Sequence, residues 1–148
     1  MPEGIKELVC PILKEELIPA LGCTEPIAIA YACAKAKEVL GAFPEKMTVC
    51  CSGNIVKNVK GVVVPNTVNL KGIKTAAVMG VVCGDASKGL QVIAGSTAQD
   101  VAQVKELLKS DLCKVELIEG EENLQIWAIL KIRFSCRSSA SIPTLRKL

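Results

Sequence analysis

One apolar, alanine-rich segment early in the chain constrains the fold more than any other feature. The stretch from Glu25 to Leu40 carries no charge between its first residue and Lys35, so the early turns of a helix here would be apolar on every side. A helix that is hydrophobic all round is buried. Pro26 suits its first turn, and Gly41 suits its C-terminal cap. We therefore expect a buried central helix.

Cys23 lies at the expected start of this helix, and Thr24 is its candidate N-cap. The unpaired N–H groups and the positive dipole end at a helix start lower the pKa of a thiol and favour the thiolate. A thiolate there is suited to bind a metal or to attack as a nucleophile. Free cysteine is also among the most buried residue types, so a small residue packed in a tight turn is the alternative. From these residues alone, both interpretations stay open.

The composition argues against several classes of function. Half of the 148 residues are apolar, but only one Trp, one Tyr and two Phe are aromatic, so aliphatic side chains must fill the core. The net charge is +3 and the lysines are scattered, which argues against nucleic-acid binding. The apolar runs are shorter than a membrane span, and the N-terminus lacks the pattern of a signal peptide. We therefore expect a cytoplasmic protein without a membrane segment.

The eight cysteines and the absence of histidine limit the chemistry. Disulfides are rare in the cytoplasm, and no C-x-x-C pair suggests a zinc ribbon or a thioredoxin-like site. Without histidine the chain has no Ser-His or Cys-His nucleophile pair and no His-ligated metal. Proton transfer would therefore fall to carboxylates, lysines, the tyrosine, thiols or a metal-bound group.

The rest of the pattern predicts an α+β fold with a mixed sheet. Besides the central helix, helices are expected at residues 5–18, 71–82 and 96–109, and strands at 46–52, 90–94, 112–118 and 124–134. The last two strands are expected to form a hairpin. With the strand and helix before them they predict a β-α-β-β layer covered by apolar helices. Ser96 and Gln99 form a candidate capping box for the last helix.

Ser52, Gly53 and Asn54 indicate a sharp turn from a strand into a short helix. Such a turn offers free N–H groups, and Lys57 adds positive charge, so the turn is a candidate binding site for a small anion. The alternative is an ordinary capped turn. The glycine patterns of P-loops and dinucleotide-binding folds are absent.

The periodic part of the sequence ends at about residue 134. Residues 135–148 are rich in serine and basic residues and show no periodicity, which is typical of a disordered tail. We therefore predict one domain, residues 1–134, followed by this tail. A domain that stops directly after a hairpin strand indicates an incomplete version of a larger fold.

Three ordered motifs stand out: Leu21-Gly22-Cys23-Thr24-Glu25-Pro26-Ile27-Ala28, then Ser52-Gly53-Asn54-Ile55 with Lys57-Asn58, and Val63-Val64-Pro65-Asn66-Thr67. Together they resemble the L-cysteine desulfidase family, which is related to the iron–sulfur L-serine dehydratase alpha chain. The likeness runs from about residue 5 to residue 131. It implies an oxygen-sensitive [4Fe–4S] enzyme without pyridoxal phosphate. Such an enzyme removes a β-substituent from L-cysteine, giving pyruvate, ammonia and sulfide, or from L-serine.

The resemblance also implies that three cysteines hold the cluster and leave one iron open to the substrate as a Lewis acid. Cys23 matches one of these ligands, and the other two belong to a C-terminal half that has no counterpart here. Because one ligand cannot hold such a cluster, we expect the chain alone to be inactive. We also expect it to associate with the missing half or to form a homo-oligomer. The resemblance identifies no catalytic residue in this chain, and Ser52, Gly53, Asn54 and Lys57 are the candidate substrate-binding residues.

Two alternatives to a lyase fragment remain from the sequence. One is a non-catalytic association module with a vestigial cluster site, and the other is a small-anion-binding domain that uses the turn at Ser52. The motifs do not distinguish L-cysteine from L-serine as the substrate. Nor do they distinguish a natural truncation from one half of a split enzyme or an isolated N-terminal region.

Overall fold

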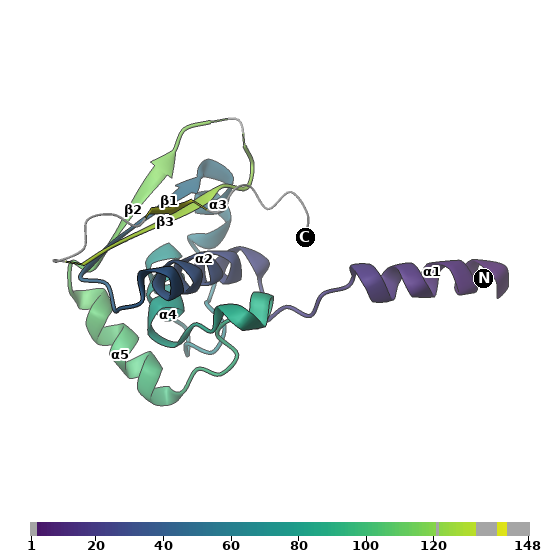
Figure 1. Cartoon of the computed structure of the whole chain (residues 1–148), viewed down its shortest axis with the longest axis horizontal. Coiled ribbons are helices and arrows are strands. Elements are labelled where there is room, and N and C mark those ends of the chain that lie inside the picture. Colours follow the sequence, from purple (N-terminus) through teal and green to yellow (C-terminus); the bar gives the residue numbers. More distant parts are fainter. Residues whose placement is uncertain (1–2, 121, 133–138, 142–148) are drawn as a thin grey trace.

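The computed structural model describes residues 3–120, 122–132 and 139–141. In chain order its elements are α1 (Glu3–Glu16), α2 (Thr24–Leu40), β1 (Lys46–Ser52), α3 (Gly53–Val59), α4 (Ile73–Cys83), the 3₁₀ helix η1 (Ala86–Gln91), α5 (Ala98–Lys109), β2 (Cys113–Ile118), β3 (Ile126–Lys131) and β4 (Ser139–Ser141). The sheet forms one layer, and α2, α4 and α5 lie beneath it (Figure 1). The predicted α+β fold with a mixed sheet is confirmed.

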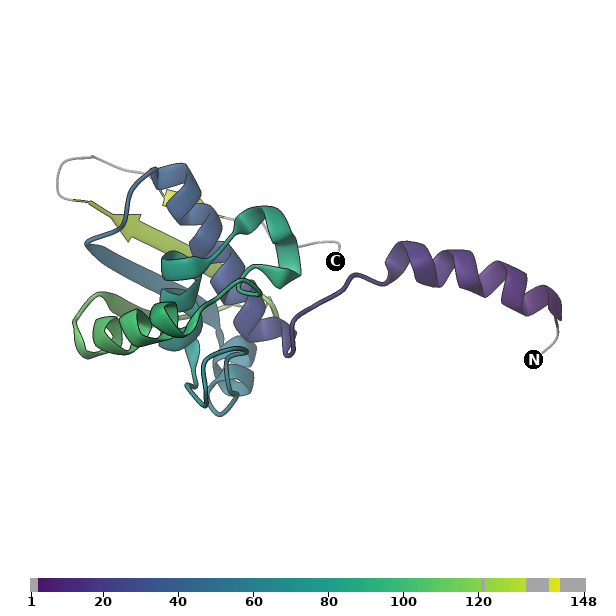
Figure 2. The same cartoon turned by 90° about the horizontal axis from the view of Figure 1, so that it is seen from below.

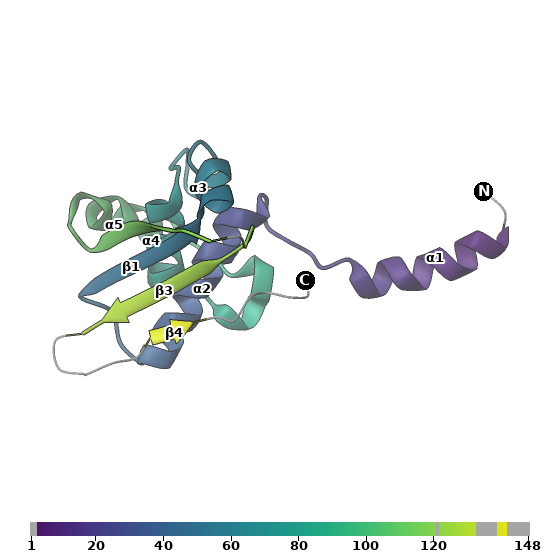
Figure 3. The same ribbon diagram turned by 90° about the horizontal axis from the view of Figure 1, so that it is seen from above.

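The sheet has the strand order β2-β1-β3-β4. β2 runs parallel to β1, whereas β3 runs antiparallel to it and pairs with β4 on its other side. Seen from above, α2, α4 and α5 lie behind the strands (Figure 3). The predicted hairpin between β2 and β3 is wrong, because β1 lies between them. β1 is buried along most of its length, which suits a central strand but does not reveal its neighbours.

Two local predictions also need correction. The strand predicted at 90–94 is absent: the chain there completes η1 and continues as a turn. The capping box of α5 lies one residue later than predicted. Thr97 Oγ1 accepts a hydrogen bond from the Asp100 backbone N–H at 3.2 Å, and Asp100 Oδ2 accepts one from the Thr97 backbone N–H at 2.8 Å.

α2 is the centre of the core, as its apolar sequence predicts. Ile27, Ile29 and Ala30 are fully buried. α2 packs against α4 and β3, and Figure 2 shows α2 beside α4 under the sheet. A Cβ at Gly80 of α4 would overlap the carbonyl oxygen of Ala30, so glycine is what allows these two helices to approach so closely. Gly41 ends α2 in the left-handed conformation, at φ 71°, as expected of a C-cap glycine.

α1 stands apart from this core. In Figures 1 and 2 it projects from the body of the molecule at the end of an extended segment. The helix ends two residues before the predicted limit and continues through Pro11 without a break. None of the α1 side chains that the structure describes belongs to the core cluster of buried residues. α1 is therefore an arm and not a layer of the domain.

The C-terminal segment is only partly described. Ser139–Ser141 forms β4, so at these residues the prediction of a disordered tail is wrong. The rest of that prediction falls on residues outside the described part of the chain. Within residues 3–120, 122–132 and 139–141, the structure has no helix long and apolar enough to cross a membrane.

Candidate functional site

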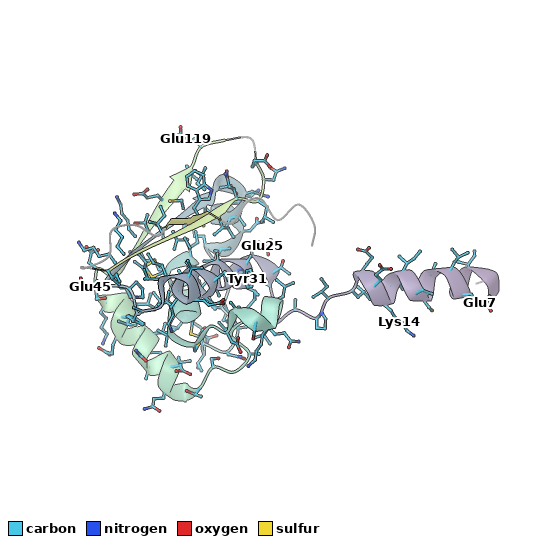
Figure 4. All side chains as sticks on the ribbon, viewed as in Figure 1. Glu7, Lys14, Glu25, Tyr31, Glu45 and Glu119 are labelled. Atoms are coloured by element: carbon cyan, nitrogen blue, oxygen red, sulfur yellow. The ribbon has the colours of Figure 1, made fainter. Side chains whose placement is uncertain are left out.

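The three sequence motifs, which are distant in the chain, meet at the start of α2. Gly22 precedes the helix with φ 71°, and a Cβ at this position would lie only 2.9 Å from Pro65 Cγ of the third motif. Asn58 of α3 donates a hydrogen bond from Nδ2 to Glu25 Oε1 at 3.3 Å. Figure 4 shows Glu25 at the end of α2 from which the chain leads toward α1. We call this region the α2 pole, defined by Gly22, Cys23, Glu25, Asn58 and Pro65.

Cys23 is the N-cap residue of α2, and its side chain makes no capping hydrogen bond. Instead its thiol donates to Glu25 Oε2 at 2.9 Å. This hydrogen bond raises the pKa of the Cys23 thiol, and burial and the negative charge of Glu25 raise it further. The carboxylate of Glu25 therefore works against the thiolate that the helix start was expected to favour. Thr24, the predicted cap, is instead the first residue of the helix.

The Glu25 carboxylate is the shared acceptor of the side-chain hydrogen bonds at the α2 pole. It accepts hydrogen bonds from the Cys23 thiol, from Thr24 Oγ1 at 3.3 Å and from Asn58 Nδ2. The hydrogen bond from Cys23, with those from its own backbone N–H, Thr24 and Asn58, lowers the pKa of the Glu25 carboxyl. Glu25 is therefore ionised at neutral pH. The sequence carried a signal for this role, because Glu25 follows Cys23 by only two residues.

A pocket of about 390 Å³ opens beside Glu25. Its walls are mostly aliphatic, and its polar lining comes from two carboxylates and one hydroxyl. The lining residues are Glu16, Leu17, Ile18, Thr24, Glu25, Ala28, Leu90 and Leu124. They come from the last residue of α1 and the segment after it, from the first turns of α2, and from two positions far along the chain. Sequence reasoning missed this pocket, since nothing local indicates that Leu90 and Leu124 lie beside α2.

The candidate substrate-binding turn is formed where it was predicted, since β1 ends at Ser52 and α3 begins at Gly53. The Ser52 side chain is buried, and its hydroxyl donates to the Asn123 carbonyl at 3.0 Å and accepts from the Gln125 backbone N–H at 3.2 Å. Ser52 therefore ties β1 to the segment before β3.

The other candidates for substrate binding lie on α3, which has only seven residues. Gly53, Asn54 and Lys57 are exposed. They share this helix with Asn58, which reaches Glu25. Their role in binding an anion stays a prediction, since no contact in the structure bears on it.

The remaining thiols are mostly part of the core. Cys33 is fully buried, and desolvation raises its pKa well above the ordinary value. Burial also raises the pKa of Cys51 to about 12 and that of Cys113 to about 11. Groups with such pKa values are thiols at neutral pH, and all three side chains are buried in the core.

The described residues contain no group of three or more His, Cys, Asp or Glu side chains placed to hold a metal ion. A [4Fe–4S] cluster takes three or four ligands. The donor set of this part of the chain therefore does not fit the cluster that the motifs implied. Cys23 as a single ligand contributed to a larger protein stays a prediction.

Comparison with known proteins shows similar chains in several bacteria. The chain is 53% identical over 120 residues to a UPF0597 protein of Lachnoclostridium phytofermentans, and the match covers 81% of this chain and 29% of that relative. It is 56% identical over 115 residues to a UPF0597 protein of Finegoldia magna, covering 78% and 28%. For a UPF0597 protein of Treponema denticola the identity is 45% over 115 residues, covering 78% and 27%. The chain thus spans less than a third of the length of these relatives. No family model and no solved structure matches.

These findings correct the assignment made from the three motifs. The proteins that match about four-fifths of the chain are named UPF0597 proteins and not L-cysteine desulfidases, so the predicted family is overturned. The name states no activity, and the assignment of this chain as a fragment of an iron–sulfur lyase is withdrawn with it. The description as a metal-binding protein is likewise unsupported, because the described residues offer no group of ligands.

Proposed function

We propose that this chain contributes a small-molecule binding site at the α2 pole to a longer protein, and that the ligand carries a protonated amine. The observation that carries the proposal is the ionised Glu25 carboxylate on the wall of an otherwise mostly aliphatic pocket. Pockets of this kind, with few polar groups in apolar walls, are the usual sites of small ligands.

The polar groups of the pocket favour a cation over an anion. Glu16 and Glu25 both line it, and none of the lining residues is a lysine or an arginine. An ammonium group has three N–H donors and no acceptor, so it complements carboxylate oxygens. The aliphatic walls would cover the carbon skeleton of the ligand. A small amino acid such as L-serine or L-cysteine is one member of this class.

Cys23 has a positioning role in this proposal. Its thiol donates to Glu25 Oε2, and Asn58 donates to Oε1, so the two donors hold the carboxylate from both sides. A held carboxylate loses less side-chain freedom when the ligand binds. We also propose a cytoplasmic location, because the seven cysteines of the described residues are all free thiols, which suits a reducing compartment.

Isothermal titration calorimetry tests the proposal with n-butylamine, L-serine and L-cysteine as probes and sodium butyrate as the matched anion. We expect the amines to bind and butyrate not to bind. Glu25→Gln keeps the shape of the side chain but removes its charge, so it should weaken amine binding at least about tenfold. Glu106→Gln, an exposed position on α5, is the matched control and should leave binding unchanged.

Three results would contradict the proposal. One is the absence of measurable heat with any of the amines at millimolar concentration. A second is amine binding that is as strong in Glu25→Gln as in the unchanged chain. Preferential binding of butyrate would also overturn it, and would instead favour an anion site such as the one predicted at the start of α3.

A further inference from the structure

The apolar face of α1 has no partner within the described structure. Ile5, Leu8, Val9, Ile12 and Leu13 recur at the spacing of one helical face, and all five are exposed. Leu8 exposes 70% of its surface and Ile12 53%. A contiguous apolar stripe of this kind marks an interaction surface, whereas single exposed aliphatic residues do not.

α1 also needs a partner to be stable as a helix. It has 14 residues, a length at which an isolated helix is marginal in water. Pro11 lies inside it and cannot donate the backbone hydrogen bond that a helix interior normally makes. Figures 1, 2 and 3 all show α1 projecting from the body, and no described α1 side chain joins the core. The apolar stripe must therefore pack against polypeptide outside the described structure.

A second copy of the chain is the weaker candidate for this partner. Two helices of this length would cross over only about 20 Å of axis. A stable interface buries about 800 Å² on each side, which one stripe of five aliphatic side chains does not reach by itself. The relatives are longer, and more than two-thirds of their length has no counterpart in this chain.

We propose that α1 is a docking arm whose stripe at Ile5, Leu8, Val9, Ile12 and Leu13 packs into an apolar groove of the polypeptide that makes up the remaining length of the UPF0597 relatives. Leu17 and Ile18, which follow α1 directly, line the pocket at the α2 pole. Docking of the arm would therefore also fix one wall of that pocket. This proposal does not depend on the ligand proposed for the pocket, because the docking of α1 can be measured with no ligand present.

Hydrogen exchange followed by mass spectrometry tests this docking. The isolated chain is compared with a chimera in which this chain replaces the matching stretch of the Finegoldia magna relative. We expect the α1 amides to exchange at least about 100-fold more slowly in the chimera, because amides in docked helices open rarely. The amides of α2 should be protected equally in both, which shows that the body is folded.

The double substitution Leu8→Glu and Ile12→Glu should abolish the protection of α1 in the chimera while leaving that of α2 intact. Glutamate is a good helix former, so the change removes the apolar surface and keeps the helix propensity. Val39→Glu is the matched control: it places the same charge on an exposed aliphatic position at the end of α2, and α1 should stay protected.

Fast exchange of α1 in a folded chimera would overturn the proposal, as would protection that Val39→Glu removes as completely as the double substitution. Protection in the isolated chain that rises with its concentration would overturn it in favour of a second copy. If the α2 amides show that the chimera does not fold, the unmatched part of the relative is added to the isolated chain as a separate polypeptide. Unchanged α1 exchange in that mixture would then count against the proposal.

Discussion

α1 and α2 are both helices rich in aliphatic residues, yet α2 is buried in the core and α1 is exposed. Ile29 of α2 is completely buried, whereas Leu8 of α1 exposes 70% of its surface. The first turns of α2 are apolar on every side, and the helix packs against α4 and the sheet. α1 is apolar along one face only, with Glu7, Lys14 and Glu15 among its other residues, and it projects into solvent (Figure 4).

The difference shows what an apolar pattern does and does not specify. The all-round apolar pattern of the first turns of α2 requires burial within the chain itself, because no face of those turns could remain in water. The one-sided pattern of α1 requires only that one face find a partner, and that partner need not belong to the same domain. The following predictions test this contrast by measuring unfolding and reactivity at matched positions.

The largest effect is expected where α4 approaches α2. In Gly80→Val the new side chain would overlap the backbone of Ala30, which cannot move without displacing α2. We expect the free energy of unfolding to fall by more than about 4 kcal/mol. Gly61→Val is the control, because no atom lies within 4 Å of a Cβ at that position. Urea unfolding followed by circular dichroism measures both, and equal losses would show that α2 and α4 are not packed as described.

The second prediction compares the two helices directly. Ile29→Ala should lower the free energy of unfolding by about 2–5 kcal/mol, because it leaves a cavity in the core. Leu8→Ala should change it by less than about 0.5 kcal/mol in the isolated chain, since the side chain is already in solvent. The same urea titration measures both variants. A large loss for Leu8→Ala would mean that α1 packs on the body in solution.

The third prediction concerns the two glycines that flank α2. Gly22 and Gly41 both have φ 71°, so alanine at either position incurs the left-handed strain of about 1–2 kcal/mol. At Gly22 the new Cβ would also press on Pro65, whereas at Gly41 it would meet nothing within 4 Å. Gly22→Ala should therefore cost about 1 kcal/mol more than Gly41→Ala. Equal costs would argue against the contact between the first and third motifs.

The smallest effect is on reactivity, and it compares Cys23 with Cys10 of α1. Glu25 raises the pKa of Cys23, so less thiolate is present at a given pH and alkylation is slow. Glu25→Gln removes the negative charge, so the pKa should fall and the alkylation rate at pH 8 should rise about three- to tenfold. Mass spectrometry of iodoacetamide-treated peptides measures both thiols. Cys10 is exposed on the distant arm, so its rate should not change. A rise at Cys10 of the same size would point to general loosening of the fold.

Much of the secondary structure could be predicted from the sequence because its signals are local. The alanine-rich stretch, the C-cap glycine and the turn at Ser52 depend on residues a few positions apart. The sheet order could not be predicted, since a strand's alternation shows which residues share a face but not which strand pairs with it. The strand predicted at residues 90–94 was wrong because Val92 and Ile93 lie in a turn, although their apolar side chains are buried as in a strand.

In the candidate site, too, some features follow from the local sequence and others from the tertiary structure alone. The sequence by itself determined its chemical groups, since Cys23 and Glu25 lie two residues apart at a helix start that proline and alanine specify. Only the tertiary structure decided their state: folding brings Asn58 and Pro65 to the α2 pole and encloses a pocket with Leu90 and Leu124. The physical reason is that helix starts and caps depend on neighbouring residues, whereas pockets depend on contacts between distant segments. The sequence also specified the apolar stripe of α1, and the tertiary structure showed that this chain's own core leaves it uncovered.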